Sequence, residues 1–317
     1  MKKIAVLTRD CAGVNACIRS IVRTASIYDI ETVGVLKGYT GLIDNNFISL
    51  NRRSVSGIIN KGGTILKTSR CKRFFQEDFQ QKAVKNIYDN KIDGLIVVGG
   101  NGSFTGAHIL ATKYNIPVIG IPATIDNDIN NVELAIGVDT AVNVALDAID
   151  KIRDTATSLE RIFVVEVMGR SCGYIALNSA LAGGCEEVII PEREIDFEKM
   201  CNQIIDGNKK GKASWIIVVA EGKAKAHDIG SYITNKTDLE TRVTVLGHIQ
   251  RGGSPTATDR ILASKLGNHA VNILKEGASD HCVSIKNNEL FSIPLDQAIQ
   301  PKEIEFNSNY NLIKVLT

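Results

Sequence analysis

The chain has 317 residues, and its 37 Lys and Arg against 35 Asp and Glu give a formal net charge of +2. A net charge this close to zero does not indicate a surface that binds nucleic acid or an acidic membrane. With 44% hydrophobic and 23% charged residues the composition is globular, which excludes a disordered protein, a collagen and a coiled coil. No apolar run approaches the roughly 18 residues that a membrane span needs.

The first residues and the cysteines bear on the compartment. The apolar run after Lys3 ends at Thr8, which fits a first strand better than a signal peptide. Seven scattered cysteines include no CxxC pair, which argues against a disulfide framework or a zinc site and for a reducing compartment. The five histidines show no HxxxH or HExxH spacing, so no His-based metal site is visible. We therefore expect a cytoplasmic protein.

Short apolar runs rich in β-branched residues alternate along the chain with longer segments of helical periodicity. Near-continuous hydrophobicity is typical of parallel strands that are covered on both faces. Helical periodicity is clearest over residues 141–152, where apolar residues recur at intervals of three and four. This alternation predicts an α/β protein with doubly wound parallel sheets, whose ligands bind outside the carboxyl ends of the strands. The predicted strands are 3–8, 31–36, 94–98, 118–121, 162–167, 188–190 and 215–220.

A glycine-rich turn, GGNGS at 99–103, joins the strand 94–98 to a helical segment that runs to Tyr114. Backbone N–H groups at such a helix N-terminus, together with the helix dipole, favour a phosphate group. A tight turn that needs glycine only for its geometry explains the same residues, and spacing alone slightly favours that simpler interpretation.

A pair of carboxylates follows the strand 118–121 in the segment PATIDND at 122–128. At the mouth of a parallel strand, one of Asp126 and Asp128 can accept a proton while the other holds a metal ion. Asp and Asn are also common in loops because their side chains cap turns. The position at the carboxyl end of a strand favours the functional interpretation.

Charged residues follow the next strands as well. MGR at 168–170 comes after the strand 162–167, EG at 221–222 after the strand 215–220, and GHIQRGGSP at 247–255 precedes a helix that we expect near Thr258. A single Arg or Glu at a strand end is usually a surface residue, but several charges on one rim favour a functional site. His248 and Arg251 beside a Gly-Gly turn can bind a sugar phosphate through charge-assisted hydrogen bonds, while an ordinary loop before a helix explains the same residues. Phosphate cradle, carboxylate pair and dispersed arginines together indicate phosphoryl transfer.

Four motifs in order give the chain a family resemblance. GGTIL with TSR at 62–70, TIDND at 124–128, MGR at 168–170 and GHIQRGGSP at 247–255 resemble the 6-phosphofructokinases over almost the whole chain, from Lys3 to about Leu290. The resemblance implies two Rossmann-like α/β/α domains with mostly parallel sheets and an active cleft between them. It also implies an ATP-binding domain of 1–137 plus 250–300, a fructose 6-phosphate-binding domain of 138–249 plus 301–317, and a homotetramer.

The resemblance also implies roles for individual residues. Asp126 would be the base that accepts the proton of the 1-hydroxyl of fructose 6-phosphate, with Thr124 beside the transferred group and Arg70 and Arg170 stabilising its charge. The sugar phosphate would be bound by Met168, Gly169, Glu221, His248 and Arg251, and by Arg161 and Arg242 of a neighbouring subunit. ATP would be bound by Asp10, Tyr39, Arg70, Cys71, Gly100, Asn101, Gly102 and Ser103, and Mg²⁺ by Asn101 and Asp128.

The phosphoryl donor is inferred from two positions. Pyrophosphate-dependent relatives typically carry GGDD in the cradle and Lys before TIDND, whereas this chain has Gly102 and Ala123. These residues favour ATP, although GGTIL-x-TSR and PER at 191–193 resemble the branch that includes pyrophosphate users. A pyrophosphate-dependent enzyme therefore stays open, as does a weakly active or regulatory relative that binds sugar phosphate.

The chain departs from the family on the donor side. The first loop, TRDCAGVNA at 8–16, lacks two residues, including the paired glycines, and leaves Arg9 near the phosphate path. Asn101 replaces the Asp associated with magnesium, and an amide oxygen brings one negative charge less.

An effector site is the last expectation from the resemblance. ADP or phosphoenolpyruvate would bind between subunits, and Gly57 stands where some relatives have Asp. The expected effector residues are Arg19, Arg23, Arg52, Arg153, Glu186, Lys210 and Lys212.

Overall fold

The computed structural model describes residues 1–159, 161–212 and 214–317. The chain forms two compact units, which are described one at a time. Unit 1 comprises Met1–Thr140 and Arg251–Lys302, and unit 2 comprises Ala141–Gln250 and Glu303–Thr317. In the part of the chain that is described, no helix is long and apolar enough to cross a membrane.

Unit 1 is built on a seven-stranded sheet in the order β11-β10-β5-β4-β1-β2-β3. The five inner strands are parallel, while β3 and β11 pair antiparallel with their neighbours at the two edges. The strands are β1 (Lys3–Thr8), β2 (Glu31–Val35), β3 (Phe47–Leu50), β4 (Gly94–Gly99), β5 (Val118–Pro122), β10 (His281–Lys286) and β11 (Glu289–Pro294).

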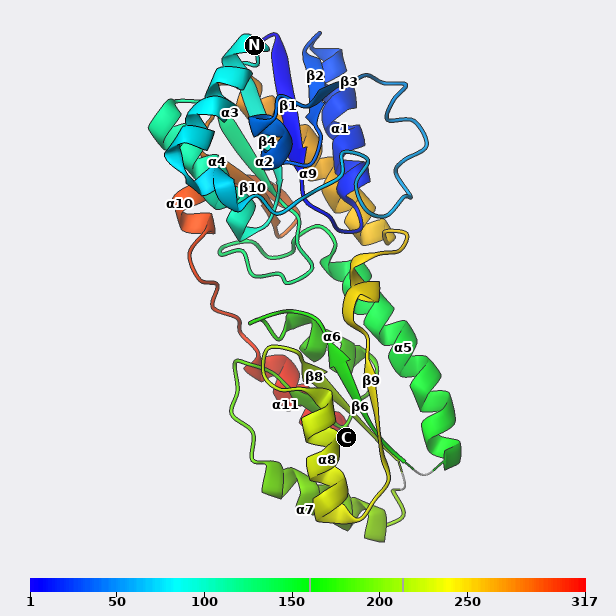
Figure 1. Cartoon of the computed structure of the whole chain (residues 1–317). Helices are drawn as coiled ribbons and strands as arrows, with labels where there is room; N and C mark the ends of the chain where they lie inside the picture. Colours follow the sequence, from blue (N-terminus) through cyan, green and yellow to red (C-terminus); the bar gives the residue numbers. More distant parts are fainter. Residues whose placement is uncertain (160, 213) are drawn as a thin grey trace. The chain divides into compact units, whose positions relative to one another are not determined.

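Helices cover both faces of this sheet. Helices α1 (Val14–Ile27) and α9 (Ala257–Lys275) pack together on one face, and α3 (Glu77–Asp89) and α4 (Asn101–Tyr114) lie on the other (Figure 1). The short elements are α2 (Tyr39–Ile43), the 3₁₀ helix η1 (Lys72–Phe75) and α10 (Leu295–Ala298).

The connections of unit 1 define a topological switch point. From β1 the chain passes through α1 to β2 on one side, whereas from β4 it passes through α4 to β5 on the other side. Strands β1 and β4 are neighbours, with Thr8 in register with Val98. Ligands of open α/β sheets bind outside the carboxyl ends of the strands at such a point. The loop after β1 and the GGNGS turn after β4 both begin there.

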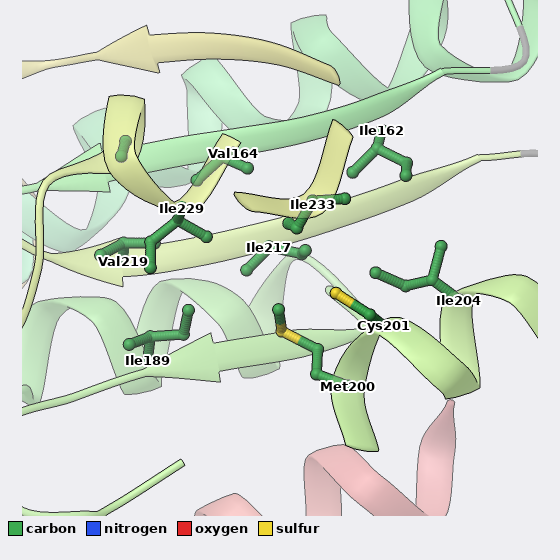
Figure 2. Packing of buried hydrophobic residues seen from close by; sticks show 11 residues of the cluster. Ile162, Val164, Ile189, Met200, Cys201, Ile204, Ile217, Val219, Ile229 and Ile233 are labelled. Atoms are coloured by element: carbon green, nitrogen blue, oxygen red, sulfur yellow. The ribbon is translucent and has the colours of Figure 1, made fainter. Parts of the chain in front are cut away.

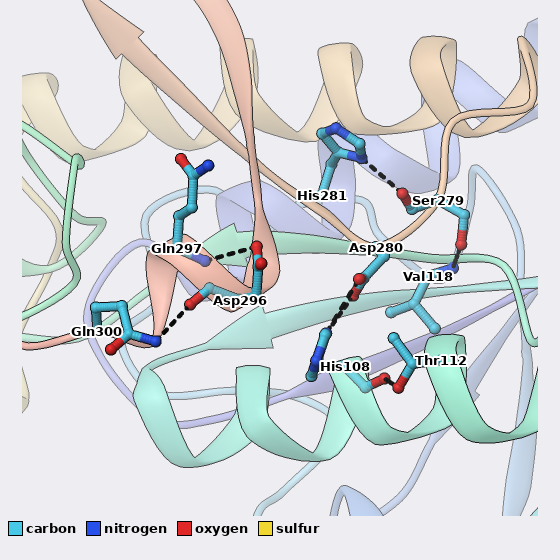
Figure 3. A network of polar contacts seen from close by, with 9 residues as sticks. All are labelled: His108, Thr112, Val118, Ser279, Asp280, His281, Asp296, Gln297 and Gln300. Carbon is cyan, nitrogen blue, oxygen red and sulfur yellow. Dashed lines mark hydrogen bonds and ion pairs between the residues drawn. The ribbon is translucent and has the colours of Figure 1, made fainter.

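The helix α4 is fixed to the sheet at its middle. His108 Nδ1 lies 2.9 Å from Asp280 Oδ1, just before β10, and the N–H of Val118 on β5 donates to Ser279 Oγ at 3.2 Å (Figure 3). His281 Nδ1 lies 2.6 Å from the carbonyl oxygen of Ser279. The contact of His108 with Asp280 therefore ties the middle of α4 to the segment before β10.

Unit 2 is built on a four-stranded parallel sheet in the order β7-β8-β6-β9. Its strands are β6 (Ile162–Val167), β7 (Glu187–Ile189), β8 (Trp215–Ala220) and β9 (Thr241–Val245). Its helices are α5 (Val138–Leu159), whose first three residues belong to unit 1, α6 (Tyr174–Ala182), α7 (Phe197–Lys209), α8 (Ala226–Thr237), the 3₁₀ helix η2 (Gly247–Arg251), whose last residue belongs to unit 1, and α11 (Asn307–Leu316).

An apolar cluster joins this sheet to α7 and α8. Val164 and Ile217 point from β6 and β8 towards Ile204 on α7 and Ile233 on α8, and all four are fully buried (Figure 2). Burying a side chain of this size stabilises the fold by about 1.5–3 kcal/mol. The cluster therefore holds α7 and α8 against one face of the sheet.

The α/β fold class is confirmed, and each predicted strand occurs within one residue of its predicted ends. Four strands were not predicted. Strand β9 alternates Thr and Arg with Val at an edge, and β3 has only four residues. Strands β10 and β11 form a hairpin through Asn287 and Asn288, whose φ angles of +51° and +66° suit a type I′ turn.

Candidate active site

The GGNGS turn forms a helix N-terminus at the switch point of unit 1. Gly99 ends β4, and α4 begins at Asn101 with Gly100 as its N-cap. The N–H groups of Ser103 and Phe104 donate to the carbonyl oxygen of Gly100 at 2.9 and 3.1 Å. The first N–H groups of a helix have no partner within it and point towards a ligand. Gly102 is exposed, and a Cβ there would meet nothing within 4 Å, so this side of the turn is open.

The TIDND segment lies directly beside this turn. The N–H of Ala123 donates to the carbonyl oxygen of Gly99 at 3.0 Å, and the position of a Cβ on Gly100 would be 3.4 Å from Thr124 Cβ. The side chain of Asp126 is almost fully buried at 1% exposure, and its N–H donates to Thr124 Oγ1 at 3.2 Å. The structure therefore brings the cradle, Thr124 and Asp126 together.

Asn127 explains the alternation of Asp and Asn in this segment. Its φ is +52°, its Oδ1 accepts a hydrogen bond from the N–H of Ala135, and its Nδ2 donates to the carbonyl oxygen of Glu133, both at 3.1 Å. Lys302 Nζ also donates to the carbonyl oxygen of Asn127 at 3.0 Å. Asn127 thus holds the loop between Asp126 and Asp128.

Asn101 links the two segments and leaves one oxygen available. Its Nδ2 donates to the carbonyl oxygen of Asp128 at 3.1 Å. Its Oδ1 is buried and accepts no hydrogen bond from the described residues. A buried amide oxygen without a partner costs free energy, which a cation or a bound water would recover.

Of the other residues expected at the donor site, Tyr39 contacts the cradle directly. The hydroxyl of Tyr39 donates to the carbonyl oxygen of Ser103 at 2.6 Å, and its ring packs on Phe74 with a centroid distance of 4.2 Å. Arg251 Nη1 donates a long bond of 3.5 Å to the carbonyl oxygen of Asp10. Arg70 is exposed and Cys71 is partly buried in the segment that leads to η1.

A buried carboxylate fixes the backbone behind the first loop. Asp259 on α9 accepts hydrogen bonds from the N–H groups of Gly137 and Thr140, both at 2.8 Å, and one from the hydroxyl of Thr140. Burial is the main cause that raises the pKa of Asp259, partly offset by these bonds. The pKa of the Cys11 thiol is raised by burial and then by Asp259, and the thiol donates to the carbonyl oxygen of Ile136 at 3.2 Å.

Three strand ends of unit 2 bring the sugar-phosphate candidates together. Gly169 has a φ of +140°, and a Cβ there would lie 2.4 Å from the carbonyl oxygen of Cys172, so only glycine fits. The N–H of Arg170 donates to Glu221 Oε1 at 3.1 Å, and the N–H of Glu221 donates to the carbonyl oxygen of Val167 at 2.9 Å. Arg170 and Glu221 therefore share one rim, with His248 exposed after β9.

Gln250 is a residue of this rim that the sequence did not single out. It is fully buried, and its Oε1 accepts a hydrogen bond from the N–H of Met168 at 2.8 Å, which ties η2 to the end of β6. Its place inside the GHIQRGGSP motif is the only sequence signal that could have indicated it.

Two arginines of unit 2 share one carboxylate. Arg161 Nε lies 2.6 Å from Glu240 Oε2, and Arg242 forms an ion pair with the other oxygen of Glu240. Arg161 and Arg242 thus lie at the amino ends of β6 and β9, away from the rim that carries Arg170 and Glu221.

The expected effector residues fall in both units. In unit 2, Arg153 Nη2 donates to the carbonyl oxygens of Gly183 and Gly184 at 2.6 and 2.8 Å. Glu186 lies 3.3 Å from Lys212 Nζ. The others are Lys210 at the C-cap of α7 and, in unit 1, Arg19 and Arg23 on successive turns of α1 and the exposed Arg52 after β3.

Comparison with known proteins points to the same family as the four sequence motifs. The family model described as Phosphofructokinase matches residues 3–274. A protein of Thermotoga petrophila is 46% identical over 319 residues, and one of Clostridium botulinum strain Loch Maree is 47% identical over 319 residues. Both matches cover 100% of each chain, and both proteins are named ATP-dependent 6-phosphofructokinase.

Solved structures agree with the fold. The phosphofructokinase of Saccharomyces cerevisiae superposes with a TM-score of 0.88 at 32% identity, over 94% of this chain and 45% of the yeast chain. The chain thus spans less than half the length of the yeast protein. A pyrophosphate-dependent phosphofructokinase from Marinobacter aquaeolei gives a TM-score of 0.85 at 21% identity, over 100% of this chain and 91% of that one, which shows the fold alone. The chain belongs to the phosphofructokinase family.

Proposed function

We propose that the protein transfers the γ-phosphoryl group of ATP to the 1-hydroxyl of fructose 6-phosphate, giving fructose 1,6-bisphosphate and ADP in glycolysis. One observation carries the proposal: the buried Asp126 lies in the segment that begins beside the cradle, where the N–H of Ala123 donates to the carbonyl oxygen of Gly99 at 3.0 Å. A base beside a phosphate site is what transfer to a hydroxyl requires. The ATP specificity rests on the full-length relatives.

In this mechanism the residues of unit 1 bind the donor and hold the proton. Asp126 accepts the proton of the attacking hydroxyl, with Thr124 beside the transferred group. Arg70 and Arg170 stabilise the charge that moves from donor to acceptor. ATP is bound by Asp10, Tyr39, Arg70, Cys71, Gly100, Asn101, Gly102 and Ser103.

A magnesium ion fits the residues of the cradle. No cluster of three or more His, Cys, Asp or Glu side chains suited to a metal occurs among the described residues. Mg²⁺ bound with phosphates keeps several waters and needs only one or two protein oxygens. The carboxylate of Asp128 and the unpartnered Oδ1 of Asn101 would hold it. When bound, the ion would neutralise charge on the donor phosphates.

The sugar phosphate is assigned to residues at the strand ends of unit 2 and to Arg251. The residues of unit 2 are Met168, Gly169, Glu221 and His248. We assign Arg161 and Arg242 to the site of a neighbouring subunit in a homotetramer. Val245 and Ile249, which follow Arg242 along the chain, are exposed apolar side chains at 49% and 62%, and a subunit contact would cover them.

We also propose an effector site for ADP or phosphoenolpyruvate. In unit 2 it would use Arg153, whose Nη2 donates to the carbonyl oxygens of Gly183 and Gly184, and Lys212, which forms an ion pair with Glu186. The cations of unit 1 would complete it from another subunit.

The direct test is formation of fructose 1,6-bisphosphate by the pure protein. A coupled assay with fructose 6-phosphate and Mg²⁺ is run with ATP, then with pyrophosphate in its place. Turnover with ATP alone supports the proposal. Turnover with pyrophosphate alone would show that pyrophosphate, and not ATP, is the donor. Binding of sugar phosphate without turnover with either donor would make the protein a regulatory relative.

A further inference from the structure

Arg9 occupies the switch point of unit 1. It directly follows β1, and its N–H donates to the carbonyl oxygen of Val98 on β4 at 2.8 Å. This bond extends the pairing of β1 with β4 by one residue. The backbone of Arg9 is therefore fixed beside the cradle, although Arg9 lies outside the GGNGS turn.

The side chain of Arg9 runs across the first glycine of the cradle. A Cβ on Gly99 would lie 2.8 Å from Arg9 Cγ and 2.5 Å from Ser103 Oγ. Contacts this short do not occur for real Cβ atoms, so Gly99 leaves the space that the stem of Arg9 fills. The stem is thus held between the end of β4 and the first turn of α4.

The guanidinium group reaches a distant loop. Arg9 Nη1 donates to the carbonyl oxygen of Ser69 at 3.1 Å, across 60 positions of the sequence. Ser69 is also held by its hydroxyl, which lies 2.7 Å from Thr40 Oγ1 and donates to the carbonyl oxygen of Lys37 at 3.1 Å. Because the Ser69 carbonyl and the Arg70 nitrogen share one planar peptide unit, a bond that fixes the carbonyl also fixes where Arg70 begins.

We propose that Arg9 is a positioning residue for phosphoryl transfer, which holds the Ser69–Arg70 peptide at the edge of the cradle. The proposal rests on the proposed function, in which Arg70 stabilises the transferred charge. Arg70 is exposed, so its backbone anchor decides where its guanidinium can reach. A charged group displaced by about 1 Å can lower the rate of a reaction by about 10²-fold.

The kinetic test uses Arg9→Met, which keeps an apolar stem over Gly99 and removes the donors. We expect kcat with ATP to fall at least tenfold and the KM for fructose 6-phosphate to stay within twofold. Arg70→Met should abolish most of the same activity, and adding Arg9→Met to it should cost less than twofold more, because Arg9 acts through Arg70. The proposal is wrong if the kcat losses of the two single variants multiply in the double variant, or if Arg9→Met leaves kcat unchanged.

Hydrogen exchange provides a readout that does not depend on activity. Peptides covering residues 64–75 should exchange faster in Arg9→Met than in the wild type. The matched control is Lys113→Met, which removes an exposed cation of α4 whose partner is Glu77 and should change neither exchange nor kinetics. If the wild type fails to form fructose 1,6-bisphosphate, the proposed function fails, while equal exchange in wild type and Arg9→Met rejects the Arg9 anchor itself.

Discussion

The hydroxyl of Tyr39 donates a hydrogen bond of 2.6 Å to the carbonyl oxygen of Ser103 in the first turn of α4. Tyr39 begins α2, and its ring packs on Phe74 of η1. The bond therefore connects the cradle with the segment that carries Arg70 and Cys71. A residue expected from the family resemblance to bind ATP also has a supporting contact within the protein.

Tyr39→Phe removes this bond and keeps the ring packing. A single hydrogen bond contributes about 0.5–1.5 kcal/mol to the free energy of unfolding, so the unfolding midpoint should fall accordingly. The KM for ATP should rise several-fold more than the KM for fructose 6-phosphate, since the bond supports only the donor side. Tyr88→Phe, at an exposed tyrosine of α3, is the control. Equal changes in the KM values for ATP and for fructose 6-phosphate would show that Tyr39 does not act on the donor site.

Asp126→Asn tests the proposed base. The amide keeps the shape of the buried side chain and cannot accept the proton, and losing a general base typically lowers the rate by about 10²–10⁴-fold. We expect kcat to fall by that factor while the KM for fructose 6-phosphate changes little. Asp147→Asn, on the exposed face of α5, is the control. A large rise in KM with kcat retained would make Asp126 a binding residue.

Cysteine labelling tests the donor site without turnover. Cys71 is the one partly exposed cysteine, and the other six are buried. Burial raises the pKa of Cys185 to about 12, so it forms little of the reactive thiolate at pH 8. Iodoacetamide should therefore modify Cys71 first, as measured by peptide mass spectrometry. MgATP should slow this reaction and fructose 6-phosphate alone should not. Labelling of Cys71 unaffected by MgATP would contradict its place in the ATP site.

The sequence predicted the central parallel strands and the motifs at their ends, because continuous apolar runs and glycine-rich turns are local signals. It did not predict how side chains reach across the fold. The contact of Arg9 with Ser69 spans 60 positions and depends on the empty space at Gly99. The role of Asn127 in the TIDND loop likewise depends on Ala135 and Glu133, which only the folded loop brings near.

Asp259 predicts a pH dependence of stability. Its pKa is raised in the folded protein, mainly by burial, above the value of about 3.9 for an unfolded Asp. The folded state then binds the proton more tightly, so the contribution of Asp259 is complete below about pH 3.9 and is lost as pH rises through the folded value. In urea unfolding, wild-type stability should fall relative to Asp259→Asn across this window.

The difference in stability between the wild type and Asp259→Asn has one part that is the same at every pH and one part that varies with pH. Asn loses an acceptor for the N–H groups of Gly137 or Thr140, which lowers stability at every pH. Only the difference between the two proteins measured from pH 4 upward reports the titration. A difference that does not vary with pH would reject a raised pKa for Asp259.

Asn101→Asp tests the metal site. At present the amide donates to the carbonyl oxygen of Asp128 and leaves Oδ1 for a cation. A carboxylate at this position loses that bond and adds a negative charge near Asp126 and Asp128, so without metal the melting temperature should fall.

With Mg²⁺ the added charge becomes favourable, because carboxylates are strong ligands of this ion. The Mg²⁺ concentration for half-maximal activity should fall about tenfold, equivalent to about 1.4 kcal/mol of binding free energy. Asn101→Ala should raise that concentration, and an identical Mg²⁺ requirement in all three proteins would remove Asn101 from the metal site.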